Sequence, residues 1–318
     1  MPRSAVFRSR NPSVVFLWTL GLFILMQVHQ YVGILLSSLM CGASFQAIIE
    51  REFYNQCCVF WQGLAAAIIG IPLVIIITRY LWRRSWEWMR FRFNVASFGY
   101  GILLGLILPG LILGLLFSLG MAAIVATPVR YGLVDLLSIV VGTVGFTMVV
   151  ALSEEVVFRG MAVREWAVTM GWPLATIFGG LYFGMAHLIG LLPSVGGLEA
   201  VWIIVSALIA GILFTAMYIR SKSLWLPIGF HFGWNLCLQL LFGTTVSGQE
   251  ASFGLYRTEL SGPAFLTGGA FGIESSVITY VLYIVAALLF LKYSKVGKPD
   301  LLKSRPSSDN KTADHPSV

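Results

Sequence analysis

Charged side chains are scarce in this chain of 318 residues. Asp, Glu, Lys and Arg make up 11% of it, whereas soluble domains carry about a quarter. Hydrophobic residues make up 58%, and the mean hydropathy is +0.85. This composition excludes an ordinary soluble enzyme or binding domain and predicts a polytopic membrane protein. We expect membrane helices to use up the length, so that no separate soluble domain is present.

Cysteine is scarce as well. Cys41, Cys57, Cys58 and Cys237 show neither metal-ligand spacing nor the even framework of a small secreted domain. We interpret all four as free thiols that pack as small hydrophobic residues.

Acidic residues are also few, and the net charge is +7. Most Lys and Arg residues flank apolar segments, so we expect the excess to set membrane orientation and not to bind nucleic acid.

Long apolar segments, or windows, are the main feature of the sequence. A bilayer is crossed by about 20 apolar residues, and eight windows qualify. They are residues 14–40, 58–82, 97–126, 133–163, 173–192, 200–219, 224–243 and 275–292. The predicted fold class is therefore all-α, a multi-pass protein of the cell membrane with about eight transmembrane helices.

The basic residues predict the orientation. Seventeen Lys and Arg residues fall on the side of the two termini, against Arg51, Arg130 and Arg257 on the opposite side. Arg159 is left out of this comparison because it lies inside the fourth window. Since positive loops stay inside, we expect both termini in the cytoplasm.

Polar side chains interrupt three of these windows. The interruptions are Glu154-Glu155-Val-Val-Phe-Arg159, Phe183-Gly-Met-Ala-His187 and His231-Phe-Gly-Trp-Asn235. Ionisable groups at membrane depth are costly and usually functional. At about 1.5 Å per residue, Glu154, His187, His231 and Asn235 lie about 14–24 Å from the cytoplasmic ends of their helices, inside a core of about 30 Å. We therefore expect them to share one site.

The spacing of these residues along their helices suggests a separate role for each. Glu155 and Arg159 are four residues apart in the order that favours a helical ion pair. Glu154 points about 100° away and is the better candidate for a general base. His231 and Asn235 face the same way and can both donate hydrogen bonds to an oxyanion. The alternative is that these polar groups only join helices by hydrogen bonds.

These three motifs, in this order, resemble the CPBP (Abi) family of CAAX-protease and bacteriocin-processing intramembrane proteases. The segment Leu224-Trp-Leu-Pro-Ile-Gly229 resembles the family's usual lead-in to its third motif. The resemblance covers about residues 145–243. It implies an intramembrane endopeptidase in which Glu154 and His187 activate a water and His231 and Asn235 stabilise the oxyanion. Glu155, Arg159 and Phe183 would support the site.

The resemblance also suggests a division of the chain. Residues 145–243 would be the protease core. Residues 1–144 would hold the first three spans and the start of the fourth. Residues 244–318 would form an extracytoplasmic loop, the last span and a disordered cytoplasmic tail.

Metal dependence is left open by the resemblance. The family is described both as metalloproteases and as metal-free glutamate enzymes. If zinc is present, Glu154, His187 and His231 are its expected ligands. The His-Glu-x-x-His motif of soluble zinc proteases is absent, so we favour a metal-free mechanism.

Two other function classes stay open, of which the first would use the same carboxylates and histidines as a relay. They are a proton- or ion-coupled transporter and an inactive scaffold that binds peptides. The expected partners are the lipid bilayer and a membrane-associated peptide or protein substrate, with no nucleic acid. The substrate can be a CAAX-type tail, a bacteriocin or another peptide.

Overall fold

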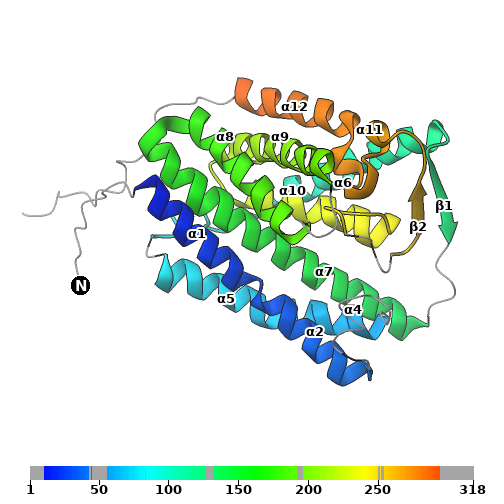
Figure 1. Ribbon diagram of the computed structural model, residues 1–318. Coiled ribbons are helices and arrows are strands. Elements are labelled where there is room, and N and C mark those ends of the chain that lie inside the picture. Colours follow the sequence, from blue (N-terminus) through cyan, green and yellow to red (C-terminus); the bar gives the residue numbers. More distant parts are fainter. Residues whose placement is uncertain are drawn as a thin grey trace, which may run out of the picture.

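Helices form nearly all of the molecule in the computed structural model, which describes residues 11–42, 44, 56–82, 84–126, 132–191, 196–249, 251 and 254–293 (Figure 1). The α-helices are α1 (Pro12–Met26), α2 (Val28–Cys41), α4 (Gln56–Ala65), α5 (Ile71–Ile76), α6 (Val95–Ser118), α7 (Leu133–Glu155), α8 (Arg164–Leu191), α9 (Gly197–Ser221), α10 (Trp225–Leu236), α11 (Ala264–Thr267) and α12 (Val277–Lys292).

In the described residues, shorter helical turns and two strands accompany these helices. The π-helical segments are η1 (Ala66–Gly70), η2 (Ile77–Leu81), η3 (Val156–Val163) and η4 (Cys237–Phe242). Two 3-10 turns are η5 (Gly269–Phe271) and η6 (Ile273–Ser275), and the strands are β1 (Ala122–Ala126) and β2 (Arg257–Leu260). The prediction of an all-α polytopic membrane protein is confirmed.

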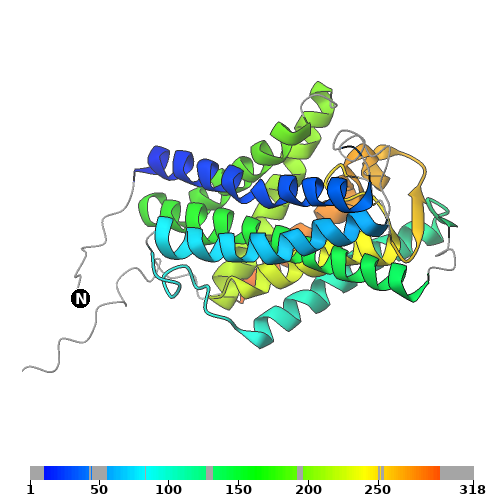
Figure 2. The same ribbon diagram turned by 90° about the horizontal axis from the view of Figure 1, so that it is seen from below.

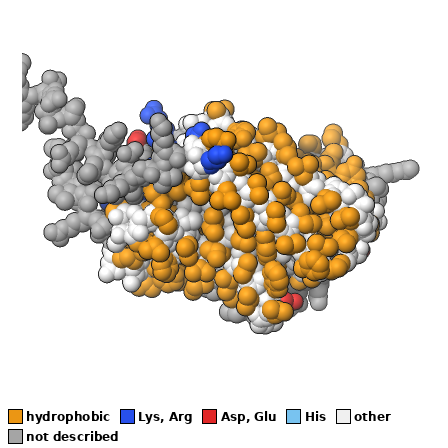
Figure 3. Space-filling view, turned by 90° about the horizontal axis from the view of Figure 1, so that it is seen from above, with side chains coloured by type: hydrophobic (Ala, Val, Ile, Leu, Met, Phe, Trp, Pro, Cys, Tyr) orange, Lys and Arg blue, Asp and Glu red, His pale blue; other side chains and the backbone are white. Residues whose placement is uncertain are grey.

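Each predicted window contains a helix. Among the described residues, five helical stretches are long and apolar enough to cross a membrane, and α12 is shorter. The five are Pro12–Cys41, Cys57–Leu81, Val95–Ser118, Leu133–Leu188 and Gly197–Ser221. The number of eight crossings stays a prediction. Figure 3 shows one face covered largely by hydrophobic side chains, with Lys and Arg gathered at one end, as a lipid-facing surface requires.

The stretch Leu133–Leu188 folds back on itself at Gly171. This glycine has φ +80° and ψ 162°, a conformation that side chains with a Cβ rarely adopt. A Cβ atom on Gly179 would meet Val163, and the ring centroids of Phe158 and Phe183 lie 4.9 Å apart, so residues about equally far from Gly171 meet and the two arms are antiparallel. The fourth and fifth windows are therefore two helices joined at one glycine, without the longer turn that their spacing predicts.

Helix α10 packs directly on α6 through glycines. A Cβ atom on Gly101 or Gly105 of α6 would overlap the backbone of α10, and one on Gly229 or Gly233 of α10 would overlap the backbone of α6. Such small-residue crossings let two helices approach to backbone contact. This contact fixes the rotation of α10, which carries His231.

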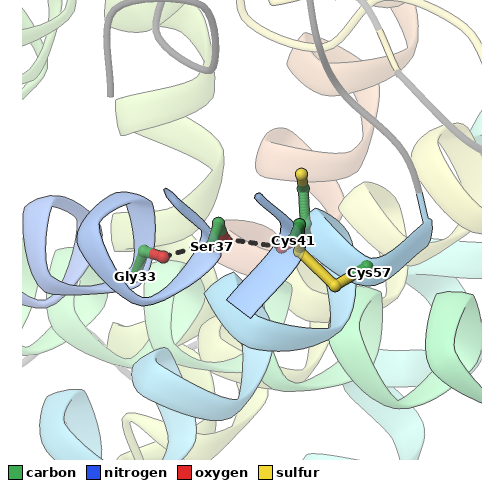
Figure 4. Close-up of a disulfide and its surroundings, with 5 residues drawn as sticks. Gly33, Ser37, Cys41 and Cys57 are labelled. Carbon is green, nitrogen blue, oxygen red and sulfur yellow. Dashed lines mark hydrogen bonds between the residues drawn. A yellow bond between two sulfur atoms is a disulfide. The ribbon is translucent and has the colours of Figure 1, made fainter. Parts of the chain in front are cut away.

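A disulfide joins Cys41 at the end of α2 to Cys57 in the first turn of α4 (Figure 4). The expectation of four free thiols is wrong for these two residues. Spacing gave no signal because the pair forms only when α2 packs along α4. Ser37 strengthens this packing, since its hydroxyl hydrogen is shared between the carbonyl of Gly33 on α2, 2.9 Å from Oγ, and that of Cys58 on α4, 3.2 Å away. Cys58 and Cys237 are buried thiols, as expected.

The described parts of residues 243–276, which we call the capping segment, lie at one end of the helices together with β1. Strands β1 and β2 pair antiparallel, and Ala122 lies opposite Leu260. The third window therefore ends in a strand, although its last residues were expected to be helical. Figures 1 and 2 both show the helices running between this end and the end where α1 begins. The predicted cytoplasmic tail lies outside the described residues.

Candidate active site

Helix α10 directs its polar face away from α6. Residues two apart on an α-helix point about 200° apart. His231 lies between Gly229 and Gly233, whose backbones meet α6, so its side chain points away from that contact. Asn235 follows one turn later on the same face, and both side chains are buried. The glycines thus explain why this face of α10 turns toward the interior.

The predicted ion pair between Glu155 and Arg159 is confirmed. Glu155 ends α7, Arg159 lies in η3, and Arg159 Nη1 donates to Glu155 Oε1 over 2.8 Å. Both side chains are buried, a position that charges tolerate mainly when paired. The guanidinium carbon lies 4.5 Å from the ring centroid of Phe183 and 4.7 Å from that of Phe214. Phe183 therefore contacts the cation of this pair by its aromatic face.

Two carboxylates face the ring of His231. Its Nδ1 lies 3.1 Å from Glu155 Oε1, a hydrogen bond to the oxygen that also accepts from Arg159. Its Nε2 lies 3.9 Å from Glu154 Oε2, which is beyond hydrogen-bond range. Within the described part of the chain, Glu154 Oε2 is buried and has no hydrogen-bond partner. Glu154 thus offers a free acceptor beside His231.

His187 presents a ring nitrogen that can accept a hydrogen bond. Its Nδ1 lies 2.9 Å from the carbonyl oxygen of Phe183, one turn earlier on α8. A carbonyl oxygen only accepts hydrogen bonds, so Nδ1 carries the hydrogen. In the neutral ring, Nε2 is then an acceptor.

His187 and His231 share one cavity of about 40 Å³, enough for a few water molecules at about 10–15 Å³ each. The lining also includes five aromatic side chains, namely Phe183, Phe214, Trp234, Phe271 and Tyr283. Glu154, Glu155, Arg159 and Asn235 are not among the residues that line it. His231 therefore lies beside both glutamates and lines the same cavity as His187. Asn235, on the next turn of α10, is outside the lining.

A carboxylate that the sequence did not single out also lines this cavity. Glu274 lies in η6, within the capping segment and outside the helices that cross the membrane. Burial raises the pKa of Glu274, while hydrogen bonds from Ser247 and the charges of His187 and His231 lower that pKa. A single acid in a loop rich in Gly and Ser carries no local signal, which explains why it was missed.

The expected zinc ligands do not form a metal site as placed. Across the described residues, no group of three or more His, Cys, Asp or Glu side chains can hold a metal ion. As the structure arranges them, Glu154, His187 and His231 do not come together as a set of zinc ligands.

Comparison with family models finds a match to the middle part of the chain. Residues 135–237 match the Rce1-like model, described as type II CAAX prenyl endopeptidase Rce1-like. The matched region runs from α7 into η4 and contains all seven residues of the three motifs. Comparisons with curated proteins and with solved structures found no match.

Proposed function

Because residues 135–237 form a domain of the Rce1-like CAAX prenyl endopeptidase family, consistent with the CPBP family, we propose that this membrane protein hydrolyses peptide bonds of membrane-associated substrates. One observation carries the proposal. Two histidines from different helices meet at a cavity that can hold a few water molecules, and two buried glutamates face one of them. A base, a water and hydrogen-bond donors are what peptide hydrolysis needs.

Glu154 and His187 are proposed to activate the water. Glu154 Oε2 has no partner among the described residues, and His187 Nε2 is an acceptor. A water that donates one hydrogen to each directs its lone pair at the substrate carbonyl. Its proton passes to Glu154 as the new C–O bond forms, and Glu154 returns the proton to the leaving nitrogen as the C–N bond breaks.

His231 and Asn235 are proposed to stabilise the oxyanion. The carboxylates of Glu154 and Glu155 face the His231 ring, so the ring can carry a hydrogen on both nitrogens. Nδ1 then donates to Glu155, and Nε2, on the side of Glu154, can donate to the substrate oxygen. Asn235 supplies a second donor from the same helix face. The pair Glu155–Arg159 holds His231 in place through the shared oxygen.

The proposed setting is the cell membrane, with both termini in the cytoplasm. The distribution of Lys and Arg supports it. The disulfide supports it as well, since Cys41 and Cys57 lie at the ends of α2 and α4 that this orientation places outside, where disulfides persist. We propose residues 145–243 as the catalytic unit, flanked by residues 1–144 and 244–318.

Comparing membrane peptides from cells with the wild-type protein and cells with Glu154→Ala tests this function. We expect some fragments to be absent in cells with Glu154→Ala and equally in cells with His187→Ala. Both variants should be present in the membrane in normal amounts. Glu259→Gln, on the exposed strand β2, is the control and should leave the fragments unchanged. Wild-type fragment patterns in both active-site variants would rule out hydrolysis by this site.

A further inference from the structure

Glu274 is held in the cavity by one of its two oxygens. Ser247 donates to Oε2 through both its backbone N–H and its Oγ, the latter over 3.0 Å. Within the described part of the chain, the hydrogen bonds to this carboxylate all end on Oε2. Oε1 is therefore available to a group in the cavity.

Ser247 is itself fixed by a tight turn. Ser247 and Gly248 have φ of +50° and +76°, and the turn is closed by pairing of Val246 with Gln249. The N–H of Gly248 donates to the carbonyl of Phe271 over 3.0 Å. The turn is thus bonded to the segment that carries Glu274.

The backbone around Glu274 is tied to the helices. Ser206 Oγ on α9 lies 2.7 Å from both Ser275 Oγ and the hydroxyl of Tyr280 on α12. Thr279 donates to the carbonyl of Ile273. Since both neighbours of Glu274 are anchored, the carboxylate is positioned before any substrate enters, as an active-site group must be.

The proposed reaction leaves one polar group of the substrate without a partner. Glu154 and His187 bind the water, and His231 and Asn235 bind the carbonyl oxygen. The scissile N–H also needs an acceptor, because an unpaired buried donor costs about 1–3 kcal/mol. As the C–N bond breaks, this nitrogen gains a proton and becomes an amine.

We propose that Glu274 is a further catalytic residue, whose Oε1 accepts a hydrogen bond from the scissile N–H and holds the leaving amine. Five aromatic rings line the same cavity, and with a carboxylate they suit a group that gains positive charge. Glu274 neither gains nor loses a proton. The proposal rests on the proposed function and extends it to the leaving group.

A matched pair of substrates tests this role. The first is a synthetic peptide that spans a bond cut only in the presence of Glu154, found by the fragment comparison above. The second is its depsipeptide, in which an ester oxygen replaces the scissile N–H. The test variant is Glu274→Gln, whose amide oxygen keeps both bonds from Ser247 and turns its NH₂ donor toward the cavity.

We expect Glu274→Gln to lower kcat/KM on the amide by about 10²-fold, a typical size for one catalytic contact. Hydrolysis of the ester should change by less than about threefold, because an ester has no N–H to bind. Equal losses on both substrates, or no loss on either, would overturn the proposal. Glu259→Gln, in the same segment, is the control. If Glu154→Ala and His187→Ala cut the amide normally, the proposed function itself fails.

Discussion

At the scale of single residues, Glu155 has the most demanding position. One of its oxygens accepts from Arg159 and from His231, while no part of its side chain is exposed. The hydrogen bonds from Arg159 and His231 stabilise the negative charge of a carboxylate that water does not reach. The residue therefore links the stability of η3 to the orientation of the His231 ring.

Removing one partner of this pair should be costly. Glu155→Gln leaves the guanidinium of Arg159 buried without its carboxylate, a change that typically costs about 3–5 kcal/mol. We expect a clearly lower melting temperature for the protein in detergent. The exposed pair Arg257–Glu259 is the control, and Glu259→Gln should leave the melting temperature unchanged. Equal melting temperatures for the two variants would contradict the structural role given to Glu155.

Sequence spacing predicted some of these contacts and not others. The pair Glu155–Arg159 follows from a separation of four residues on one helix. The bond from His231 to Glu155 joins α10 to α7, and spacing on one helix cannot reveal it. Glu274 was missed for a related reason, since only folding of the capping segment brings it to His187 and His231.

At the scale of elements, the contact of α6 with α10 controls the site. A Cβ atom on Gly105 would enter the backbone of Phe230, next to His231. On the same helix, a Cβ atom on Gly110 would meet nothing within 4 Å. The two glycines therefore form a matched pair for testing whether the spacing of α6 and α10 positions the proposed catalytic face of α10.

Gly105→Ala should separate the two helices, cost about 1–3 kcal/mol and strongly reduce peptide cleavage. Gly110→Ala should leave cleavage unchanged and stabilise the helix by about 0.5–1 kcal/mol. Melting temperatures and cleavage rates of the two variants measure the difference. Similar behaviour of both would show that the close approach of α6 does not place His231.

The capping segment should respond to pH through Glu274. A carboxylate whose pKa is raised by burial binds protons more tightly in the native state, so stability falls as pH rises from its ordinary value of 4.5 through the raised native pKa. The charges of His187 and His231 act on this carboxylate. Limited proteolysis of the segment from pH 4 to 8 should show this loss, and Glu274→Gln should flatten it. An unchanged profile in that variant would assign the loss to another group.

The helical reversal shows what a pattern of apolar residues can predict about elements. Hydropathy located both arms of the 133–191 hairpin because each is a long apolar run. It could not show that a single residue, Gly171, makes the turn, since that depends on a positive φ. The strand β1 was missed because Ala122–Ala126 is as apolar as the helix before it.

At the scale of the whole molecule, activity should survive metal removal. The described residues offer no group of three side chains that can hold an ion. After dialysis against a chelator we expect cleavage within about twofold of the starting rate, since catalysis by a bound metal would be worth several kcal/mol. Metal analysis of the same sample should find less than one ion per chain. A loss of activity that zinc restores would show that the ligands rearrange on binding.

Composition predicted the class of the whole molecule because a chain with so few charges cannot cover a soluble surface. The shared depth of the polar groups predicted that they meet, and His187, His231 and Glu154 do lie on neighbouring helices. Depth alone could not place Asn235 outside the cavity lining, because that depends on the rotation of α10.

The disulfide between Cys41 and Cys57 indicates in which compartment the joined ends of α2 and α4 lie. Chains that reach the membrane in the proposed orientation should run faster on gels without reductant, and a protease cut between the two residues should release no fragment until reductant is added. Chains inserted the other way round would keep both thiols in the reducing cytoplasm and would react with alkylating reagents. A single gel can therefore separate correctly inserted molecules from inverted ones before any activity is measured.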